Sequence, residues 1–133
     1  MLIDFHIHLF PDALATRTIP HLAGICGITP NTDGTLGDTL SKLEQWGVDK
    51  AVVLHIATKP SQQQNVNAFA ASIQSDRIIS FGSVHPAAPD AVEMLSQIKS
   101  MGLRGIKLHA DYQGFFADDR AAYPIYETCA ALG

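Results

Sequence analysis

Two histidines one residue apart near the N-terminus, His6 and His8, have the type and spacing to bind a metal. They lie in the segment 1–9, MLIDFHIHL, where polar and apolar residues alternate. This alternation predicts a β-strand with two unlike faces, one bearing Asp4, His6 and His8 and the other bearing Ile3, Phe5, Ile7 and Leu9. Burying two imidazoles and a carboxylate is unfavourable unless they are paired, and a divalent cation held by two His nitrogens would pair them. His6 and His8 are therefore predicted to be metal ligands.

An alternative interpretation needs no metal. A single buried histidine is commonly satisfied by a hydrogen bond, and two histidines on a solvent-facing edge strand would need no partner. Two features favour the metal interpretation. Asp4 precedes the histidines, and the opposite face of the strand is apolar and must be buried against other elements. Asp4 lies deeper in the predicted strand, so we expect it to orient a ligand histidine or to pair with Lys107 rather than to bind the metal itself.

Strand and helix patterns alternate along the chain and set the expected fold. Apolar runs predict strands at 1–9, 49–57, 77–85 and 103–110, and helical spacing of apolar residues predicts helices at 11–27, 36–46, 61–75, 90–102 and 119–132. The stretch 11–34 is predicted to be a helical insertion after the first strand. Four successive strand–helix units predict an α/β fold with a parallel sheet and the helices outside it.

Length and composition exclude several classes of function. The chain has 133 residues, 47% of them hydrophobic, which suits one domain with a sizeable core. A net charge of -4 and the absence of basic runs argue against nucleic-acid and membrane partners, so a small-molecule substrate is expected. No secretory leader or spanning apolar run is visible, which predicts a cytoplasmic protein. Cys26 and Cys129 are far apart and lack Cys-x-x-Cys spacing, so neither a disulfide framework nor a zinc knuckle is expected.

Three stretches resemble the amidohydrolase-related metal-dependent hydrolases, the amidohydrolase 2 group that includes aminocarboxymuconate-semialdehyde decarboxylase-like enzymes. They are IDFHIHLFPD at 3–12, GVDKAVV at 47–53, and the run from GLRGIKLH at 102–109 through QGFF to PIYE at 124–127. The resemblance spans the chain but matches only the N-terminal half of the family's pattern. It implies a TIM-type (β/α)8 barrel, of which residues 1–133 would form about four βα units. Further histidine ligands and a metal-binding Asp would follow on later strands.

The resemblance also implies a chemistry and positions for other site residues. Reactive groups of such barrels lie at the carboxyl ends of the strands, where His8, His55, His85 and His109 are all predicted to fall. Lys107 and His109 share one face of the fourth predicted strand and should point into the barrel beside the metal. Lys107 is expected to bind a substrate carboxylate or to form an ion pair with Asp4 or a nearby carboxylate; carbamylation of Lys107 to bridge two metals, as in some related binuclear hydrolases, is less favoured. His109 is either a substrate-contacting or ligand-supporting group or a hydrogen-bonded core histidine, and His55 and His85 could likewise be satisfied by backbone groups.

The implied function is hydrolysis of a small amide, ester or organic acid by water activated on a divalent metal, with zinc expected. A catalytic zinc usually has three protein ligands, so two histidines form a partial site and weak or absent activity is expected of the isolated chain. Two alternatives stay open: a non-oxidative decarboxylase of the same family, and a non-catalytic half-barrel that self-assembles. A TatD-like nuclease or PHP-type phosphoesterase is disfavoured by the acidic charge and by the placement of every glutamate on predicted helices, namely Glu44, Glu93 and Glu127.

A sheet of four parallel strands cannot close into a barrel. It would leave two edges with unpaired backbone groups and an uncovered inner face. We therefore expect a homo-oligomer in which a second copy covers the open sheet edges.

Overall fold

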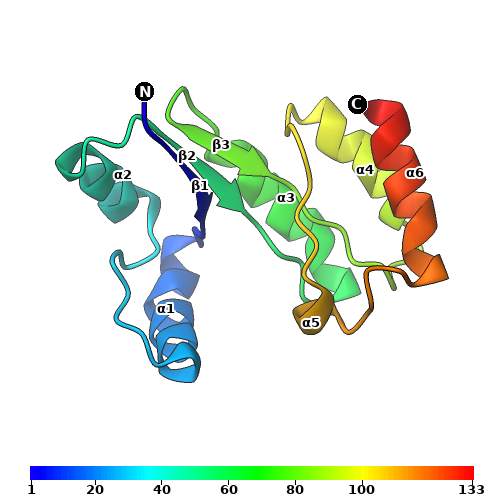
Figure 1. Cartoon of the computed structure of the whole chain (residues 1–133), viewed down its shortest axis with the longest axis horizontal. Helices are drawn as coiled ribbons and strands as arrows, with labels where there is room; N and C mark the ends of the chain where they lie inside the picture. The colour runs from blue at the N-terminus through cyan, green and yellow to red at the C-terminus, as the bar shows by residue number, and fades with distance from the viewer.

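Three parallel strands form the single sheet of the protein, in the order β1-β2-β3 (Figure 1). They are β1 (Ile3–Ile7), β2 (Lys50–Leu54) and β3 (Ile78–Phe81). The structure is a computed structural model and describes all of residues 1–133. Helices follow the strands: α1 (Asp12–Cys26), α2 (Leu36–Gln45), α3 (Gln63–Ser72), α4 (Ala91–Ser100), α5 (Ala110–Gln113) and α6 (Tyr123–Leu132), with 3-10 turns at Pro60–Gln62 and Arg120–Ala122. The predicted α/β fold with a parallel sheet is confirmed.

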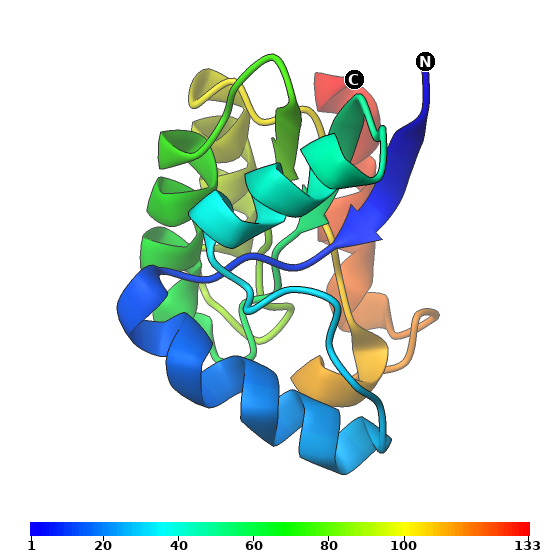
Figure 2. The same ribbon diagram turned by 90° about the vertical axis from the view of Figure 1, so that its left-hand side faces the viewer.

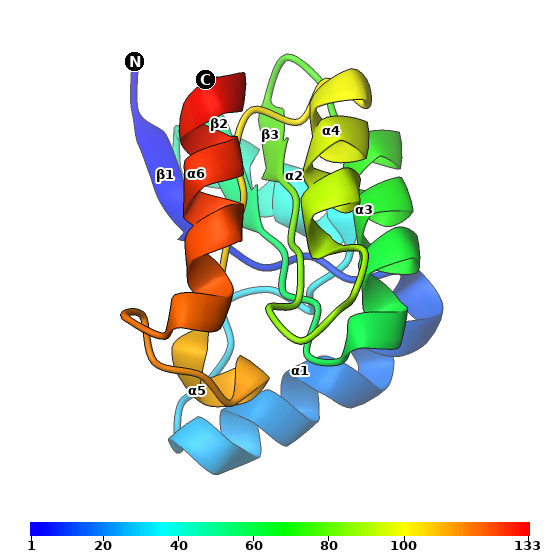
Figure 3. The same cartoon turned by 90° about the vertical axis from the view of Figure 1, so that its right-hand side faces the viewer.

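The two termini lie at one end of the molecule, and the strands run from there toward the end occupied by α1 and α5 (Figures 1 and 2). Helices α4 and α6 lie side by side beyond β3, at the opposite end of the molecule from the edge strand β1 (Figures 1 and 3). The carboxyl ends of the strands, where a barrel enzyme places its chemistry, therefore face α1 and α5. None of the helices combines the length and the apolar character needed to cross a lipid bilayer.

One hydrophobic cluster joins the sheet to α2 and α3. It consists of Leu9, Leu43, Val48, Ala51, Val53, Ile73 and Ile78, with Ile7, Leu36, Leu40 and Phe69 packed against it. Helix α2 supplies a stripe at helical spacing, as the sequence predicted, and begins where the Thr35 hydroxyl accepts the Asp38 backbone N–H at 3.2 Å. This cluster packs α2 and α3 against the sheet.

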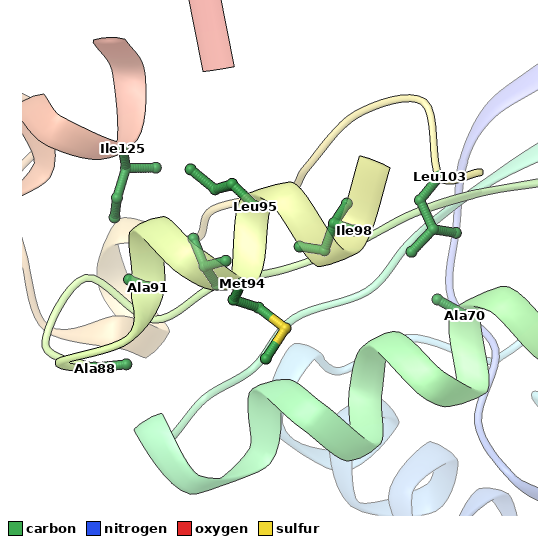
Figure 4. Close-up of a cluster of buried hydrophobic side chains, with 9 residues drawn as sticks. Ala70, Ala88, Ala91, Met94, Leu95, Ile98, Leu103 and Ile125 are labelled. Atoms are coloured by element: carbon green, nitrogen blue, oxygen red, sulfur yellow. The ribbon is translucent and has the colours of Figure 1, made fainter. Parts of the chain in front are cut away.

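A second cluster lies between α3, α4 and α6 (Figure 4). Its nine buried residues are Ala70, Val84, Ala88, Ala91, Met94, Leu95, Ile98, Leu103 and Ile125. Small side chains on α3 and at the start of α4 let the helices approach, and Met94, Leu95 and Ile98 fill the space between them. Burial of such side chains is the main favourable contribution to folding, so this cluster ties α6 to the rest of the chain.

The fourth strand expected over residues 103–110 is reduced to a single parallel bridge between Gly82 and Ile106. Two backbone hydrogen bonds of 2.8 Å form it, from Gly82 to Gly105 and from Lys107 to Gly82. Beyond this point side chains replace the ladder, because the Ser83 hydroxyl donates to the Lys107 carbonyl at 2.9 Å. The segment still runs beside β3, but side-chain hydrogen bonds take the place of strand pairing.

The predicted alternation of faces fails within β1, where the pairing register with β2 shifts between Asp4 and Ile7. Such a shift is the signature of a β-bulge, and an extra residue moves the following side chains to the opposite face. Phe5 accordingly contacts Phe81 edge-on at a ring distance of 6.1 Å, whereas Ile7 packs into the cluster shared with α2. The expectation that Phe5 and Ile7 share a face was therefore wrong.

Strand β1 is an edge strand, and most of its side chains are exposed. Phe5, at 64% exposed, lies on the face that no helix covers. Self-association through this edge stays a prediction.

Gly105→Ala is expected to destabilise the fold by about 1–3 kcal/mol, because it overpacks the contact between residues 103–110 and β3. A Cβ at position 105 would lie 2.8 to 3.1 Å from three carbons of the Phe81 ring, which already packs against Phe5. Urea unfolding measures the loss. The control is Gly37→Ala in α2, where nothing lies within 4 Å and a small stabilisation is expected. Equal effects of the two substitutions would contradict the packing argument.

Candidate functional site

His6 and His8 lie side by side at the end of β1. Their ring centroids are 5.0 Å apart and the ring planes are inclined at 71°. The Nδ1 of His8 is 2.9 Å from the carbonyl oxygen of Leu54, the last residue of β2. Because a carbonyl only accepts, Nδ1 is the protonated nitrogen and Nε2 has a free lone pair. Metal-binding histidines are typically oriented in this way, with the other ring nitrogen donating to a backbone carbonyl or carboxylate.

The surroundings of His8 favour its neutral form. Partial desolvation of the ring, and then the positive charge of His6, lower the pKa of His8 below its ordinary value of 6.5, while the hydrogen bond to Leu54 opposes the change. Lys107 and His109 lower the pKa of His8 further. A metal requires neutral imidazole, so the environment that disfavours the imidazolium also prepares His8 as a ligand.

The pKa effects place three of the predicted residues, His6, Lys107 and His109, near His8, and the effect of His8 on the pKa of His55 adds a fourth. Lys107 and His109 lie close enough to His8 for their charges to act on its pKa. Both are half-buried and come from the segment beside β3, as the sequence predicted. Neither of the two ion pairs in the structure involves Lys107, so its ammonium group has no carboxylate partner.

Asp4 acts on the backbone of His6 rather than on an imidazole. Its Oδ1 accepts the His6 backbone N–H at 3.1 Å, across the irregular part of β1. This contact fixes the chain at the point where the histidines leave the strand. The structure has no ion pair between Asp4 and Lys107, which was one of the two predicted roles of Asp4.

His109 begins the one-turn helix α5. Its Nδ1 accepts the backbone N–H of Tyr112 at 3.4 Å, and its ring stacks on the Tyr112 ring with centroids 4.2 Å apart and planes inclined at 11°. Since Nδ1 is an acceptor, the neutral ring holds its proton on Nε2. His109 is therefore arranged as a hydrogen-bond donor at Nε2.

His85 follows the alternative that the sequence left open, that of a histidine satisfied within the fold. Its Nδ1 accepts the Ala87 backbone N–H at 3.1 Å in the turn before α4. His55 does not follow it, because its ring is buried edge-on against Phe69 of α3 and its Nε2 is buried without a hydrogen-bond partner. His55 also lies close enough to His8 for the charge of His8 to lower its pKa.

The burial of His55 predicts a loss of stability in acid. Desolvation lowers its pKa from 6.5 to about 4, so between these values the unfolded chain binds a proton that the folded chain does not. The contribution of His55 to the free energy of unfolding is fully present above pH 6.5 and is lost as the pH falls toward 4. One pKa unit corresponds to about 1.4 kcal/mol, so this shift predicts that the free energy of unfolding falls by about 3 kcal/mol over this pH range. Urea unfolding of the parent and of His55→Leu across this range measures it, and equal pH dependence in both would contradict the assignment.

A divalent metal fits the donor set of this chain in part. The free Nε2 of the oriented His8 and the adjacent His6 ring are suitable ligands. Within residues 1–133 no group of three or more His, Cys, Asp or Glu side chains is placed to hold a metal ion. The chain thus offers two imidazoles toward a coordination sphere that usually has three or four protein ligands.

Buried amides support these strand ends, and the sequence analysis did not identify them. Asn67 of α3 accepts the Ser83 N–H at 2.8 Å and donates to the Ser83 carbonyl at 2.9 Å. Gln63, one turn earlier, donates to Asp90 at 2.7 Å. The signal was available, because Gln63, Asn67 and Ala70 recur at helical spacing on the buried stripe of α3. An amide on a buried stripe indicates a backbone partner.

Comparison with known families decides the relationship of this chain. The sequence profile described as amidohydrolase matches residues 3–133. The chain belongs to the amidohydrolase family. A search of curated proteins gives no match.

Among solved structures, this amidohydrolase chain is similar to the crystal structure of 4-oxalomesaconate hydratase, LigJ, from Rhodopseudomonas palustris. The two share 21% sequence identity with a TM-score of 0.63, over 99% of this chain and 50% of the hydratase. At this identity the likeness concerns the fold alone. The chain spans half the length of that structure.

Proposed function

We propose that this amidohydrolase chain is the N-terminal, metal-binding part of a metal-dependent hydrolase, with His6 and His8 as two ligands of one divalent ion, zinc by expectation. The observation that supports the proposal best is the hydrogen bond from His8 Nδ1 to the Leu54 carbonyl at 2.9 Å. It leaves Nε2 unprotonated in a ring 5.0 Å from that of His6.

In the proposed reaction the residues of this chain bind and orient a small substrate. A divalent metal supplies a Lewis acid that lowers the pKa of water to about 7. Lys107 binds a negatively charged substrate oxygen, because its ammonium group lies in the histidine region without an acidic partner. His109 donates from Nε2 to a second substrate oxygen, since Nδ1 is occupied by Tyr112.

The architecture proposed for the complete site is a (β/α)8 barrel whose first four βα units are formed by residues 1–133. The segment beside β3 would occupy the fourth strand position, supported by the bridge from Gly82 to Ile106. The similarity to half of a hydratase chain of about twice the length agrees with this arrangement. The remaining ligands would then come from later strands.

A second candidate is a lyase that acts on an organic acid, such as a non-oxidative decarboxylase. The unpaired Lys107 ammonium favours it, because a carboxylate substrate would supply the missing counter-charge. The solved relative is itself named a hydratase of an organic acid. The two candidates share the metal ligands and differ in the bond that is broken.

A turnover assay with zinc tests the proposal on small amides, esters and carboxylic acids. Low rates are expected, because two histidines bind zinc incompletely. Hydrolysis products that require zinc, His6 and His8 would support the hydrolase, and zinc-dependent release of carbon dioxide would support the lyase. A parent chain that does not bind zinc would contradict the proposal.

A further inference from the structure

Gln113, the last residue of α5, is a buried side chain that contacts three separate segments at the carboxyl ends of the strands. Its Nε2 donates to the carbonyl of Ala57, beyond β2, at 2.9 Å, and to that of Val84, beyond β3, at 2.8 Å. Its Oε1 accepts the backbone N–H of His109 at 2.9 Å. One amide thus joins the ends of β2 and β3 to the segment that bears His109.

These hydrogen bonds occupy the place of a strand ladder. The bridge at Gly82 includes the bond from Lys107 N–H to the Gly82 carbonyl. In a regular parallel ladder the next bond of this kind, two residues on, would join His109 N–H to the Val84 carbonyl. Both groups bond instead to the Gln113 amide, which accepts from His109 and donates to Val84. The side chain therefore separates the two segments by the width of an amide at the position of His109.

This separation determines where the His109 ring lies. The chain leaves the line of the sheet where α5 begins (Figure 1). The His109 ring at this point stacks on the Tyr112 ring at a centroid distance of 4.2 Å. The α5 helix has only four residues, so its own backbone bonds contribute little to its position. The buried amide is the contact that fixes the turn to β2 and β3.

We propose that Gln113 is a positioning residue that holds the His109 ring on Tyr112 at the carboxyl ends of the strands. The catalytic meaning of this placement rests on the proposed function, but the placement itself does not. The carbonyls of Ala57 and Val84 orient the Gln113 amide, and the amide oxygen in turn binds the backbone N–H of His109. An amide is required because one group must donate to two carbonyls and accept from one N–H at the same time.

The test uses Gln113→Met, which keeps the length of the side chain and removes its hydrogen bonds. NMR signals of the His109 and Tyr112 rings report their stacking, and calorimetry reports zinc affinity. In the folded variant we expect the ring signals to move toward those of unstacked rings, with zinc affinity within about twofold of the parent, since the contacts of His8 run through Leu54. Unchanged ring signals would overturn the proposal.

Gln113→Glu serves as the conservative variant and keeps the test decisive if Gln113→Met does not fold. A protonated carboxyl can accept the His109 N–H and donate its single O–H to one of the two carbonyls, whereas a carboxylate only accepts and faces both carbonyls. We expect Tyr112 ring signals nearer to those of the parent below the pKa of this carboxyl and signals displaced further above it. Signals that are identical on both sides of that pKa would overturn the proposal. Failure of the parent chain to bind zinc would count against the proposed function only.

Discussion

Replacing His8 by alanine is expected to weaken zinc binding by at least about a hundredfold. Loss of an outer partner of a ligand already costs about 10–100-fold in metal affinity, and loss of the ligand itself costs more. His8 is the better prepared of the two histidines, because Leu54 fixes its tautomer and its surroundings keep it neutral. Calorimetric titration of zinc into the parent and the variant at neutral pH measures the difference.

His21 provides the matched control. It is an exposed histidine on α1 and does not belong to the group formed by His6, His8, Lys107 and His109. His21→Ala is expected to leave the zinc affinity unchanged. If His8→Ala and His21→Ala reduce the affinity equally, zinc binds to surface histidines in general and the assignment to β1 fails.

The largest expected effect on stability comes from Asn67→Leu. Asn67 is fully buried and satisfies both backbone groups of Ser83, so leucine would leave a buried N–H and a buried carbonyl without partners. Each unsatisfied group costs about 1–3 kcal/mol, which predicts a loss of about 2–6 kcal/mol. A domain of ordinary stability has about 5–15 kcal/mol in total. Urea unfolding, or the fraction of soluble folded chain, measures the result.

Asn65→Leu is the control for this substitution, because Asn65 lies on the same helix and is exposed. Its replacement by leucine removes no buried partner, so a change within about 0.5 kcal/mol is expected. A stability of the Asn67 variant equal to that of the Asn65 variant would show that Ser83 finds other partners, against the proposed role of the buried amide.

The strand–helix order was predictable because apolar spacing is a local property. Leu36, Leu40 and Leu43 indicated the buried stripe of α2, and the continuous apolar run around Val52 and Val53 indicated a strand covered on both faces. These patterns depend on neighbouring residues alone. They gave the class of fold and the strands on which the histidines lie.

The faces of β1 and the length of the strands could not be predicted in this way. The register shift between Asp4 and Ile7 depends on pairing with β2, which no alternation within β1 reveals. The strands end early because side chains from distant helices replace ladder partners, as Asn67 does at Ser83 and Gln113 does at Val84. Such exchanges occur between residues far apart in sequence, so local patterns place the strand but not its end.

The candidate site was anticipated in its members and not in its details. The proximity of Lys107 and His109 to His8 followed from parallel topology, since strand ends on one edge of a sheet lie together. The anchoring of His8 by Leu54 and the bond from Asp4 to the His6 backbone required the register of β1 against β2. His55, the residue after β2, faces the helices because it lies two residues after Val53, whose side chain packs in the cluster shared with α2 and α3.

The most direct test of the central claim is an NMR titration that follows the imidazole nitrogens of all six histidines as zinc is added. The account predicts that the nitrogens of His6 and His8 shift together and reach their end point at one equivalent of zinc, with Nε2 as the metal-binding nitrogen of His8. His21 and His85 should keep their signals. Zinc that shifts neither His6 nor His8, or that binds His8 through Nδ1 with loss of the Leu54 contact, would contradict the assignment of β1 as a metal-binding strand.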